Sequence, residues 1–448
     1  MVKIMEGGYI EEAKEFLERN KVKVWANVDL ITVEGTKISG LILPAPENTR
    51  KYIYIKLPNG YNIAIEVKRI SQIRVNKIEK IEYRIPEKPK KKKPNLPNVM
   101  LLGAGGTIAS RVEYSTGAVK PAFTETELLN AIPELENIAN IDAINLFNIF
   151  SEDMKPRNWI EIAKKIENSI QNDDYRGIVI THGTDTMQYT AAALAFMLDN
   201  IPIPITITGA QRSSDRPASD SATNLIASVL FTSKSDVGEV TVVMHKNLND
   251  TICTAHRGVR VRKMHSSRRD AFKTIGDTPI ADIDLEKGKI VYLRDDYTKV
   301  SKDKTKFKAN PVFEEKTAML YIYPNIPTEL IEYFIDKKYR GIVLIGTGLG
   351  HVAEDLLKPI ERGVQEKVTF VMTTQCLWGP VAMNVYERGR RLQKIGVIPA
   401  NGILPEVAYV KLGWILAQTE DQKEIRKLMT TNLKNEIVLR EKISQYIC

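Results

Sequence analysis

The chain has 448 residues, of which 43% are hydrophobic and 27% are charged. These values exclude a disordered or fibrous protein and are typical of a globular chain with two to four domains. The formal net charge of +9 leaves two interpretations open: an acidic or nucleic-acid partner, or a lysine-rich surface in water.

Cysteine and histidine are sparse and scattered. The three cysteines are Cys253, Cys376 and Cys448, and none of them forms a CxxC pair. This predicts a reducing compartment and no metal site. The N-terminus mixes acids and bases, and no stretch has about 18 uninterrupted apolar residues, so we expect neither a signal peptide nor a membrane span. We therefore expect a cytoplasmic protein.

Residues 1–85 predict a small β-barrel-like domain. A short helix is expected at 9–19, followed by several alternating apolar and polar runs. Two of these runs flank Pro58-Asn59-Gly60, and Asn-Gly supplies the positive φ angles of a tight hairpin turn.

Residues 86–98 predict a linker. The stretch "RIPEKPKKKKPNLPN" at 84–98 holds four prolines and a lysine run, which oppose both a helix and a central strand. It is either an extended spacer only or a basic tether beside an RNA-binding surface.

Beyond the linker, the pattern predicts an α/β fold with two doubly wound domains, at 99–300 and 315–448. Continuous apolar runs alternate with amphipathic helical patterns, which indicates parallel sheets covered on both faces. The phrase "YRGIV" stands at 175–179 and again at 339–343, each time before a loop with glycine and threonine. Such sheets bind ligands at the carboxyl ends of their strands.

The loop in "LLGAGGTIAS" (101–110) is rich in glycine but fits no phosphate-binding motif. A dinucleotide fingerprint needs glycine where Ile108 stands, and a P-loop needs a lysine that this loop lacks. Thr107 is therefore the candidate chemical group.

A second loop, "THGTDTM" at 181–187, follows another apolar run. Its threonines and Asp185 could simply cap a helix. Two polar loops that both follow strands of one sheet instead favour a common site.

Two motifs together resemble the bacterial-type L-asparaginase family, "GGTIA" at 105–109 and "HGTDT" at 182–186. Three later phrases also resemble that family, "FSEDM" (150–154), "TGAQRSSDRPASD" (208–220) and "NGILPEVAYVKLGW" (401–414). The resemblance covers roughly 97–448 and implies two asparaginase-like α/β domains that hydrolyse a side-chain amide.

The resemblance implies Thr107 as the nucleophile and a second cluster of Thr184, Asp185 and Lys263. A threonine hydroxyl needs a base, and no Ser-His-Asp arrangement is legible, so Lys263 is the expected proton acceptor, hydrogen-bonded to Thr184. We hypothesise that the neighbouring arginines of the run 257–269 favour loss of its proton. Which threonine attacks first stays open.

Three further residues complete the expected site. Tyr114 resembles the family's mobile tyrosine, although a surface loop tyrosine is the alternative. Ser151 matches the serine that binds the substrate carboxylate, and Asp185 would pair with the substrate's α-ammonium. Glu152 departs from the family, which usually has glutamine there, so the preferred amide donor stays open.

The β-domain and the run "RGVRVRKMHSSRRDAF" (257–272) are not features of a free asparaginase. Together they resemble the asparaginase-like amidase subunits of archaeal glutamyl-tRNA(Gln) amidotransferases. This implies a homodimer at the centre of a heterotetramer, with two copies of a partner, the E subunit, that binds ATP and Mg²⁺ and amidates Glu-tRNA(Gln). No ATP-binding loop is legible in this chain, and we expect no cofactor in it.

The arginine run itself has two interpretations. It either holds Lys263 and the substrate in place or faces RNA or a partner subunit. Two alternatives remain for the whole chain: a free type I L-asparaginase with an added domain, and an RNA-binding module on an inactive hydrolase scaffold.

Overall fold

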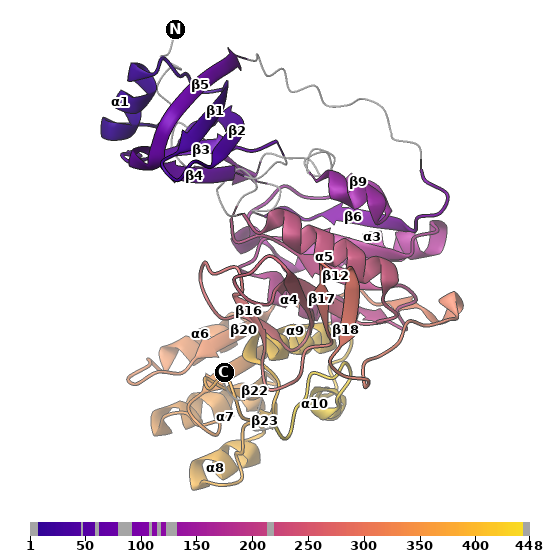
Figure 1. Ribbon diagram of the computed structural model, residues 1–448. Helices are drawn as coiled ribbons and strands as arrows, with labels where there is room; N and C mark the ends of the chain where they lie inside the picture. The colour runs from indigo at the N-terminus through magenta and orange to yellow at the C-terminus, as the bar shows by residue number, and fades with distance from the viewer. Residues whose placement is uncertain are drawn as a thin grey trace.

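The computed structural model describes residues 8–45, 48–58, 62–78, 92–106, 110–113, 118–121, 132–212 and 219–441. A five-stranded, an eight-stranded and a four-stranded sheet follow one another along the chain (Figure 1). Thr107, Tyr114 and the first part of the expected linker lie outside the described residues.

The N-terminal unit is a five-stranded antiparallel sheet with its own core, as the alternating pattern predicts. Its elements are α1 (Glu11–Arg19), β1 (Ala26–Thr32), β2 (Lys37–Ile42), β3 (Tyr52–Lys56), β4 (Asn62–Glu66), the short 3-10 helix η1 (Val67–Arg69) and β5 (Ile70–Ile78). The strand order is β4-β3-β2-β1-β5, so the described sheet has two edges rather than a closed circuit. Strands β3 and β4 form the predicted hairpin, although Asn59 and Gly60 in its turn are not described.

The eight-stranded sheet has the order β18-β17-β14-β13-β12-β10-β6-β9. Its strands are β6 (Asn98–Gly103), β9 (Asn140–Asn145), β10 (Gly177–Thr181), β12 (Ile205–Thr208), β13 (Val240–His245), β14 (Ile252–Arg257), β17 (Ala281–Asp284) and β18 (Lys289–Tyr292). The strands from β9 to β13 are parallel, and the last three are antiparallel. The first strand of this sheet in chain order, β6, lies between the second, β9, and the third, β10. The strand order therefore reverses between β6 and β10, and such a switch point is where open α/β sheets bind ligands.

Helices cover both faces of the parallel part of this sheet. They are α3 (Pro156–Asn172), α4 (Met187–Met197) and α5 (Ser221–Lys234). Along β6, Met100 and Leu102 share a core with α3 and α4, whereas Val99 and Leu101 share another with α5. This two-residue alternation explains why the whole strand is apolar.

The four-stranded sheet is parallel and has the order β20-β21-β22-β23. Its strands are β20 (Thr317–Tyr321), β21 (Gly341–Gly346), β22 (Thr369–Thr374) and β23 (Ile398–Pro399), and its helices are α6 (Glu329–Asp336), α7 (Leu357–Gln365), α8 (Glu387–Ile395), α9 (Pro405–Leu416) and α10 (Gln422–Thr430). Ile342 and Leu344 pack with α6 and α7, whereas Val343 packs with α9. Both faces are again covered, but the strands follow one another in chain order.

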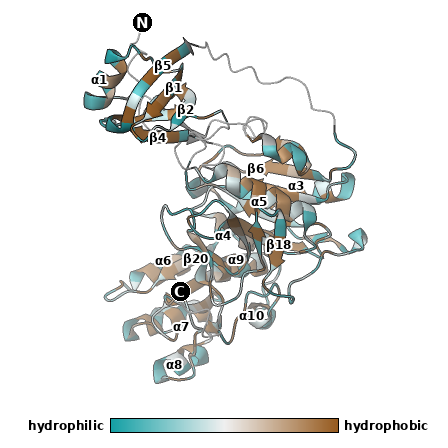
Figure 2. Cartoon of the chain, viewed as in Figure 1, coloured by the Kyte–Doolittle hydropathy of each residue, from teal (hydrophilic) through white to brown (hydrophobic). Residues whose placement is uncertain are grey.

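Three small strand pairs complete the described fold: β7 (Ser110–Glu113) with β8 (Ala118–Pro121), β11 (Leu198–Asp199) with β19 (Lys308–Ala309), and β15 (Val261–Lys263) with β16 (Phe272–Thr274). Figure 2 shows hydrophobic residues concentrated on the sheets and on the central helices α4 and α9, whereas α8 and α10 are mostly hydrophilic. None of the described helices is long and apolar enough to cross a membrane.

Candidate active site

The first loop leaves β6 at the switch point and lies directly against the second loop. The Ala104 N–H donates to Thr181 O at 2.9 Å, and the Gly106 N–H donates to Ile149 O at 3.2 Å. Gly106 has φ +90°, and a Cβ there would overlap the backbone of Gly183. Only glycine fits at this position, which explains the glycines without any phosphate. Thr107 is the next residue in the chain and is not described.

The second loop carries Thr184 and Asp185 to the tip of β15, where Lys263 lies. The Lys263 Nζ donates to Thr184 Oγ1 at 2.8 Å and to Asp185 Oδ1 at 2.7 Å. The side chain of Lys263 is 9% exposed, whereas that of Asp185 is 66% exposed. The buried amine thus bridges a hydroxyl and a carboxylate that opens to solvent.

Ser151 lies on the other side of the same loop. It is buried at the start of the short 3-10 helix η4 (Ser151–Asp153), and its Oγ donates to Asp185 Oδ2 at 3.4 Å. The Thr186 Oγ1 donates to Ser151 O at 2.7 Å, which joins the two segments. Glu152 is exposed beside Ser151, with its Oε2 3.5 Å from Ser151 Oγ.

Five of the seven predicted site residues are described. The structure brings four of them together and places one at the margin: Ser151, Thr184, Asp185 and Lys263, with Glu152 exposed next to Ser151. Thr107 and Tyr114 lie outside the described residues.

The arginine side chains of the run pair with groups other than Lys263, and activation of Lys263 by neighbouring guanidinium groups stays a prediction. Each arginine side chain binds another partner. Arg260 donates to the carbonyls of Ile275, Gly402 and Glu436, Arg262 pairs with Glu406, Arg268 pairs with Asp270, and Arg269 pairs with Asp250. The ion pair that Lys263 makes is with a carboxylate, that of Asp185.

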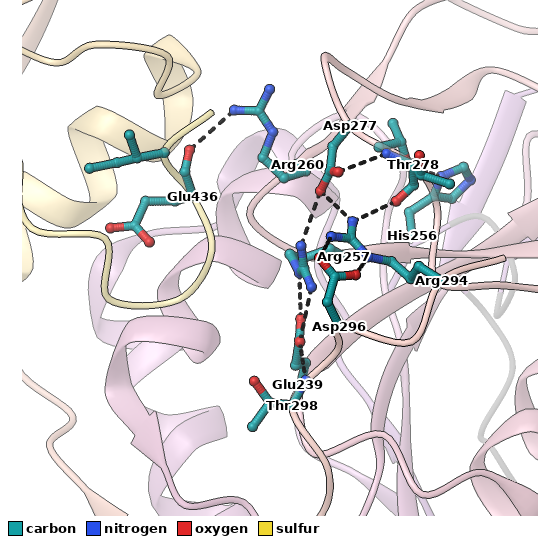
Figure 3. A network of polar contacts seen from close by, with 12 residues as sticks. Glu239, His256, Arg257, Arg260, Asp277, Thr278, Arg294, Asp296, Thr298 and Glu436 are labelled. Carbon is teal, nitrogen blue, oxygen red and sulfur yellow. Dashed lines mark hydrogen bonds and ion pairs between the residues drawn. The ribbon is translucent and has the colours of Figure 1, made fainter. Parts of the chain in front are cut away.

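A buried polar network supports the segment before Lys263 (Figure 3). Arg257 is 3% exposed and contacts Glu239 Oε2 at 2.6 Å and Asp277 Oδ2 at 3.0 Å. Arg294 reaches the same Asp277 oxygen at 2.7 Å. Burial lowers the pKa of Arg260 to about 10. Arg257 and Arg260 thus act as internal supports, which agrees with the interpretation that the run holds Lys263 in place.

Sequence reasoning missed the partners of these arginines. Glu239 and Asp277 lie 18 and 20 residues away from Arg257 and carry no motif. The chain also offers no sign that Arg260 reaches Glu436, 176 residues later. The only available signal was the unusual density of arginine itself.

A cavity of about 440 Å³ lies elsewhere in the molecule. Its lining includes Leu96, Arg176 and Leu230, near the amino ends of the parallel strands. Since the switch point lies at the carboxyl ends, this cavity is not part of the site. Nor do the described residues contain a group of three histidine, cysteine, aspartate or glutamate side chains that could hold a metal ion.

The sheet order and the threonine, aspartate and lysine at its switch point define a class, the asparaginase-type amidohydrolases. The family model "Asparaginase, N-terminal" matches residues 98–297, and "Glutaminase/Asparaginase C-terminal domain" matches 316–429. A solved L-asparaginase from Thermococcus kodakarensis is similar over 76% of this chain and 99% of its own, with 30% identity and a TM-score of 0.68. L-asparaginase I from Vibrio cholerae gives 27% identity over 77% and 100% of the two chains and a TM-score of 0.66.

The N-terminal unit identifies a narrower family within this class. Residues 26–75 match the family model "GatD N-terminal domain". The D subunit of glutamyl-tRNA(Gln) amidotransferase from Pyrococcus horikoshii is 49% identical over 97% of this chain and 99% of its own length. The corresponding protein of Pyrococcus furiosus is 50% identical over 95% and 97%. The chain belongs to the family of glutamyl-tRNA(Gln) amidotransferase D subunits.

Proposed function

We propose that this chain is the amidase subunit of a glutamyl-tRNA(Gln) amidotransferase. It releases ammonia from glutamine or asparagine and passes it to a partner subunit, which converts Glu-tRNA(Gln) to Gln-tRNA(Gln). The observation that carries the proposal is the contact of Lys263 with Thr184 and Asp185 at the sheet switch point, in a chain similar to D subunits over almost its whole length.

In the proposed reaction, the Thr107 hydroxyl adds to the side-chain amide carbonyl. The amide nitrogen leaves as ammonia after gaining a proton, and the acyl group stays on the threonine oxygen as an ester. A water activated near Thr184 then hydrolyses this ester, which returns the threonine hydroxyl and releases the acid. Lys263, hydrogen-bonded to Thr184 Oγ1, is the proposed base.

In this proposal Asp185 binds Lys263 first and the substrate's α-ammonium afterwards. An ammonium group paired with a carboxylate has no lone pair, so Lys263 must give a proton to solvent and loosen its contact with Asp185 before it acts as a base. The α-ammonium of a bound amino acid is a cation that competes for the same exposed carboxylate. Substrate binding and activation of the lysine are then linked through one side chain.

The substrate's α-carboxylate is assigned to Ser151, and Tyr114 is assigned to positioning or deprotonating the nucleophile. The buried Oγ of Ser151 lies within 3.4 Å of Asp185 Oδ2, which fits a site for both charged groups of an amino acid. Glu152 adds a negative charge beside this position and weakens the attraction for a substrate carboxylate.

The proposal includes a cytoplasmic heterotetramer. A homodimer of this chain would lie at its centre with two copies of the E subunit, and ATP and Mg²⁺ would belong to that partner. The likeness to D subunits over 97% of the chain supports the presence of such a partner.

The test is ammonia release from glutamine and from asparagine, measured with this chain alone and then with the E subunit and Glu-tRNA(Gln). A low basal rate that rises when both are added supports the proposal. Full hydrolysis of asparagine that ignores both additions would identify a free asparaginase instead. Binding of tRNA with no ammonia release under any condition would indicate an RNA-binding module on an inactive scaffold.

A further inference from the structure

A chain of three buried polar groups lies directly behind the second loop. His182 follows β10 and has no exposed surface. Its Nδ1 lies 2.7 Å from Gly183 O, and its Nε2 lies 2.8 Å from Thr190 Oγ1 on α4. The Trp159 Nε1 on α3 lies 3.0 Å from the same Thr190 oxygen.

The chemistry of these groups permits one arrangement of protons. A carbonyl oxygen only accepts, so the Nδ1 of His182 carries the proton that faces Gly183 O. In a neutral imidazole the other nitrogen then accepts, and Thr190 Oγ1 must donate to it. The Trp159 indole N–H only donates, and it fills the remaining acceptor site on Thr190 Oγ1. Every donor in this chain of contacts meets an acceptor.

The hydrogen bond from His182 Nδ1 to Gly183 O sets the orientation of the peptide group between Gly183 and Thr184. In a trans peptide the C=O and the N–H point in opposite directions. Because His182 draws the Gly183 carbonyl toward the core, the N–H of Thr184 points away from the core. Within the described residues that N–H makes no hydrogen bond, so it is available to a ligand.

We propose that His182 is a positioning residue that, held as the Nδ1–H tautomer by Thr190 and Trp159, turns the Thr184 N–H toward the oxygen of the substrate amide. This inference rests on the proposed amide hydrolysis. Backbone N–H groups held in advance stabilise the developing oxyanion better than groups that must first reorient. His182 itself touches no substrate and transfers no proton.

Burial keeps the ring neutral for this role. It lowers the pKa of His182 to about 4, against which the bond to Gly183 O acts only partly. The ring therefore stays neutral near pH 7, and the pH profile of the reaction in that range does not report it.

Two substitutions separate positioning from simple structural support. In H182N the amide nitrogen takes the place of Nδ1 and can still donate to Gly183 O, whereas in H182Q it takes the place of Nε2 and cannot. Each variant gives up one of the two hydrogen bonds, so both lose similar stability.

We expect H182Q in the complete complex to lower kcat roughly 100-fold with little change in KM, the loss typical of one oxyanion donor. H182N should stay within about 3-fold of the wild-type kcat. Equal losses of kcat in the two variants at equal melting temperatures would overturn the inference.

A second measurement does not depend on activity. In NMR spectra of the chain labelled with ¹⁵N-histidine, the His182 signal is the one that disappears in H182N and H182Q. Its chemical shifts should be those of the Nδ1–H tautomer and should stay constant between about pH 5.5 and 8. An Nε2–H tautomer, or a titration in that range, would contradict the inference even if amide hydrolysis is confirmed. A correct tautomer in a chain that releases no ammonia would instead refute the proposed function and leave the geometry standing.

Discussion

At the scale of single residues, Lys263 holds the position on which the proposed chemistry depends. Its amine is buried between Thr184 Oγ1 and Asp185 Oδ1, and the Asp185 side chain is 66% exposed. An ion pair with so exposed a partner contributes only about 0–1 kcal/mol to folding. The lysine is therefore expected to matter far more for turnover than for stability.

The substitution Lys263→Met should lower kcat for amide hydrolysis by about 100-fold or more, since it removes the proposed base. The melting temperature should change by only a few degrees. Lys273→Met is the matched control, because Lys273 lies on the other strand of the same hairpin and its side chain is 45% exposed. Unimpaired turnover in the Lys263 variant would exclude it as the base.

A second residue-scale prediction concerns Gly183. A Cβ at this position would lie 2.5 Å from Ser151 Cβ and 2.9 Å from Ser151 Oγ, so Gly183→Ala must displace the serine. A hydrogen bond to a charged group is worth about 1.5–3 kcal/mol, so we expect KM for the amide donor to rise at least ~10-fold. Ser151→Ala should raise KM by a similar factor. If the glycine variant binds its donor normally, Ser151 does not hold the substrate carboxylate.

From the sequence alone, the candidate site residues that stand in motifs could be identified. Residues whose roles depend on partners far away in the chain could not. Thr184, Asp185 and Ser151 stand in short recognisable phrases, so their proximity could be predicted. The role of His182 depends on Thr190 and on Trp159, which lies 31 residues before Thr190 on another helix. No local pattern encodes that meeting, because helix packing alone determines it.

At the scale of elements, Arg260 connects the β15–β16 hairpin to the C-terminal domain through hydrogen bonds. This arginine is fully buried and donates to the backbone carbonyls of Ile275, Gly402 and Glu436. The segment after α10 is fixed in turn by Lys411 and Glu436, whose side chains are both 0% exposed. The hairpin that presents Lys263 is thus joined to the end of the C-terminal domain.

Arg260→Met should destabilise the protein by about 3 kcal/mol or more, because it leaves three carbonyls without a donor at about 1–3 kcal/mol each. It should also lower kcat, since the hairpin loses its support. Arg268→Met is the control, because Arg268 is 51% exposed and its buried partner Asp270 keeps Lys273 as a second cation. Thermal unfolding of both variants checks the expectation, and equal melting temperatures would contradict it.

Residue periodicity predicted the type of most elements but not the order of their strands. Alternation at 21–70 predicted a hairpin within a small β-barrel-like domain, and continuous apolar runs predicted a covered parallel sheet. The antiparallel hairpin and the parallel sheet are confirmed. The second parallel sheet runs in chain order and lacks the reversal seen between β6 and β10. Strand order depends on which face each crossing helix covers, and apolar strands look alike on both faces.

At the scale of the whole molecule, buried neutral histidines make stability depend on pH. Burial lowers the pKa of His182 to about 4, and burial together with Lys273 lowers that of His256 to about 3. An unfolded histidine has a pKa near 6.5. Between about pH 6.5 and 4 the unfolded chain binds protons that the folded chain does not, so stability falls as pH falls.

As the pH falls through that range, each of these histidines should lower the free energy of unfolding by up to about 1.4 kcal/mol per pH unit. The melting temperature should therefore fall progressively from about pH 6.5 to 4.5. His256→Asn can keep the hydrogen bond to Thr274 Oγ1 and should flatten this dependence. Parallel curves for the variant and the wild type would show that His256 is not kept neutral by the fold.

The hydrogen bonds of Arg260 to the C-terminal domain also determine when during biosynthesis the hairpin can be supported. Its carbonyl partners at Gly402 and Glu436 are 142 and 176 residues further along the chain. At about 5–20 residues per second, the ribosome needs roughly 10–35 s to make the later one after Arg260 has been added. The nascent chain completes the support of its lysine hairpin only after Glu436 has been made. Chains that stop before Glu436 should therefore release ammonia more slowly than the full-length chain.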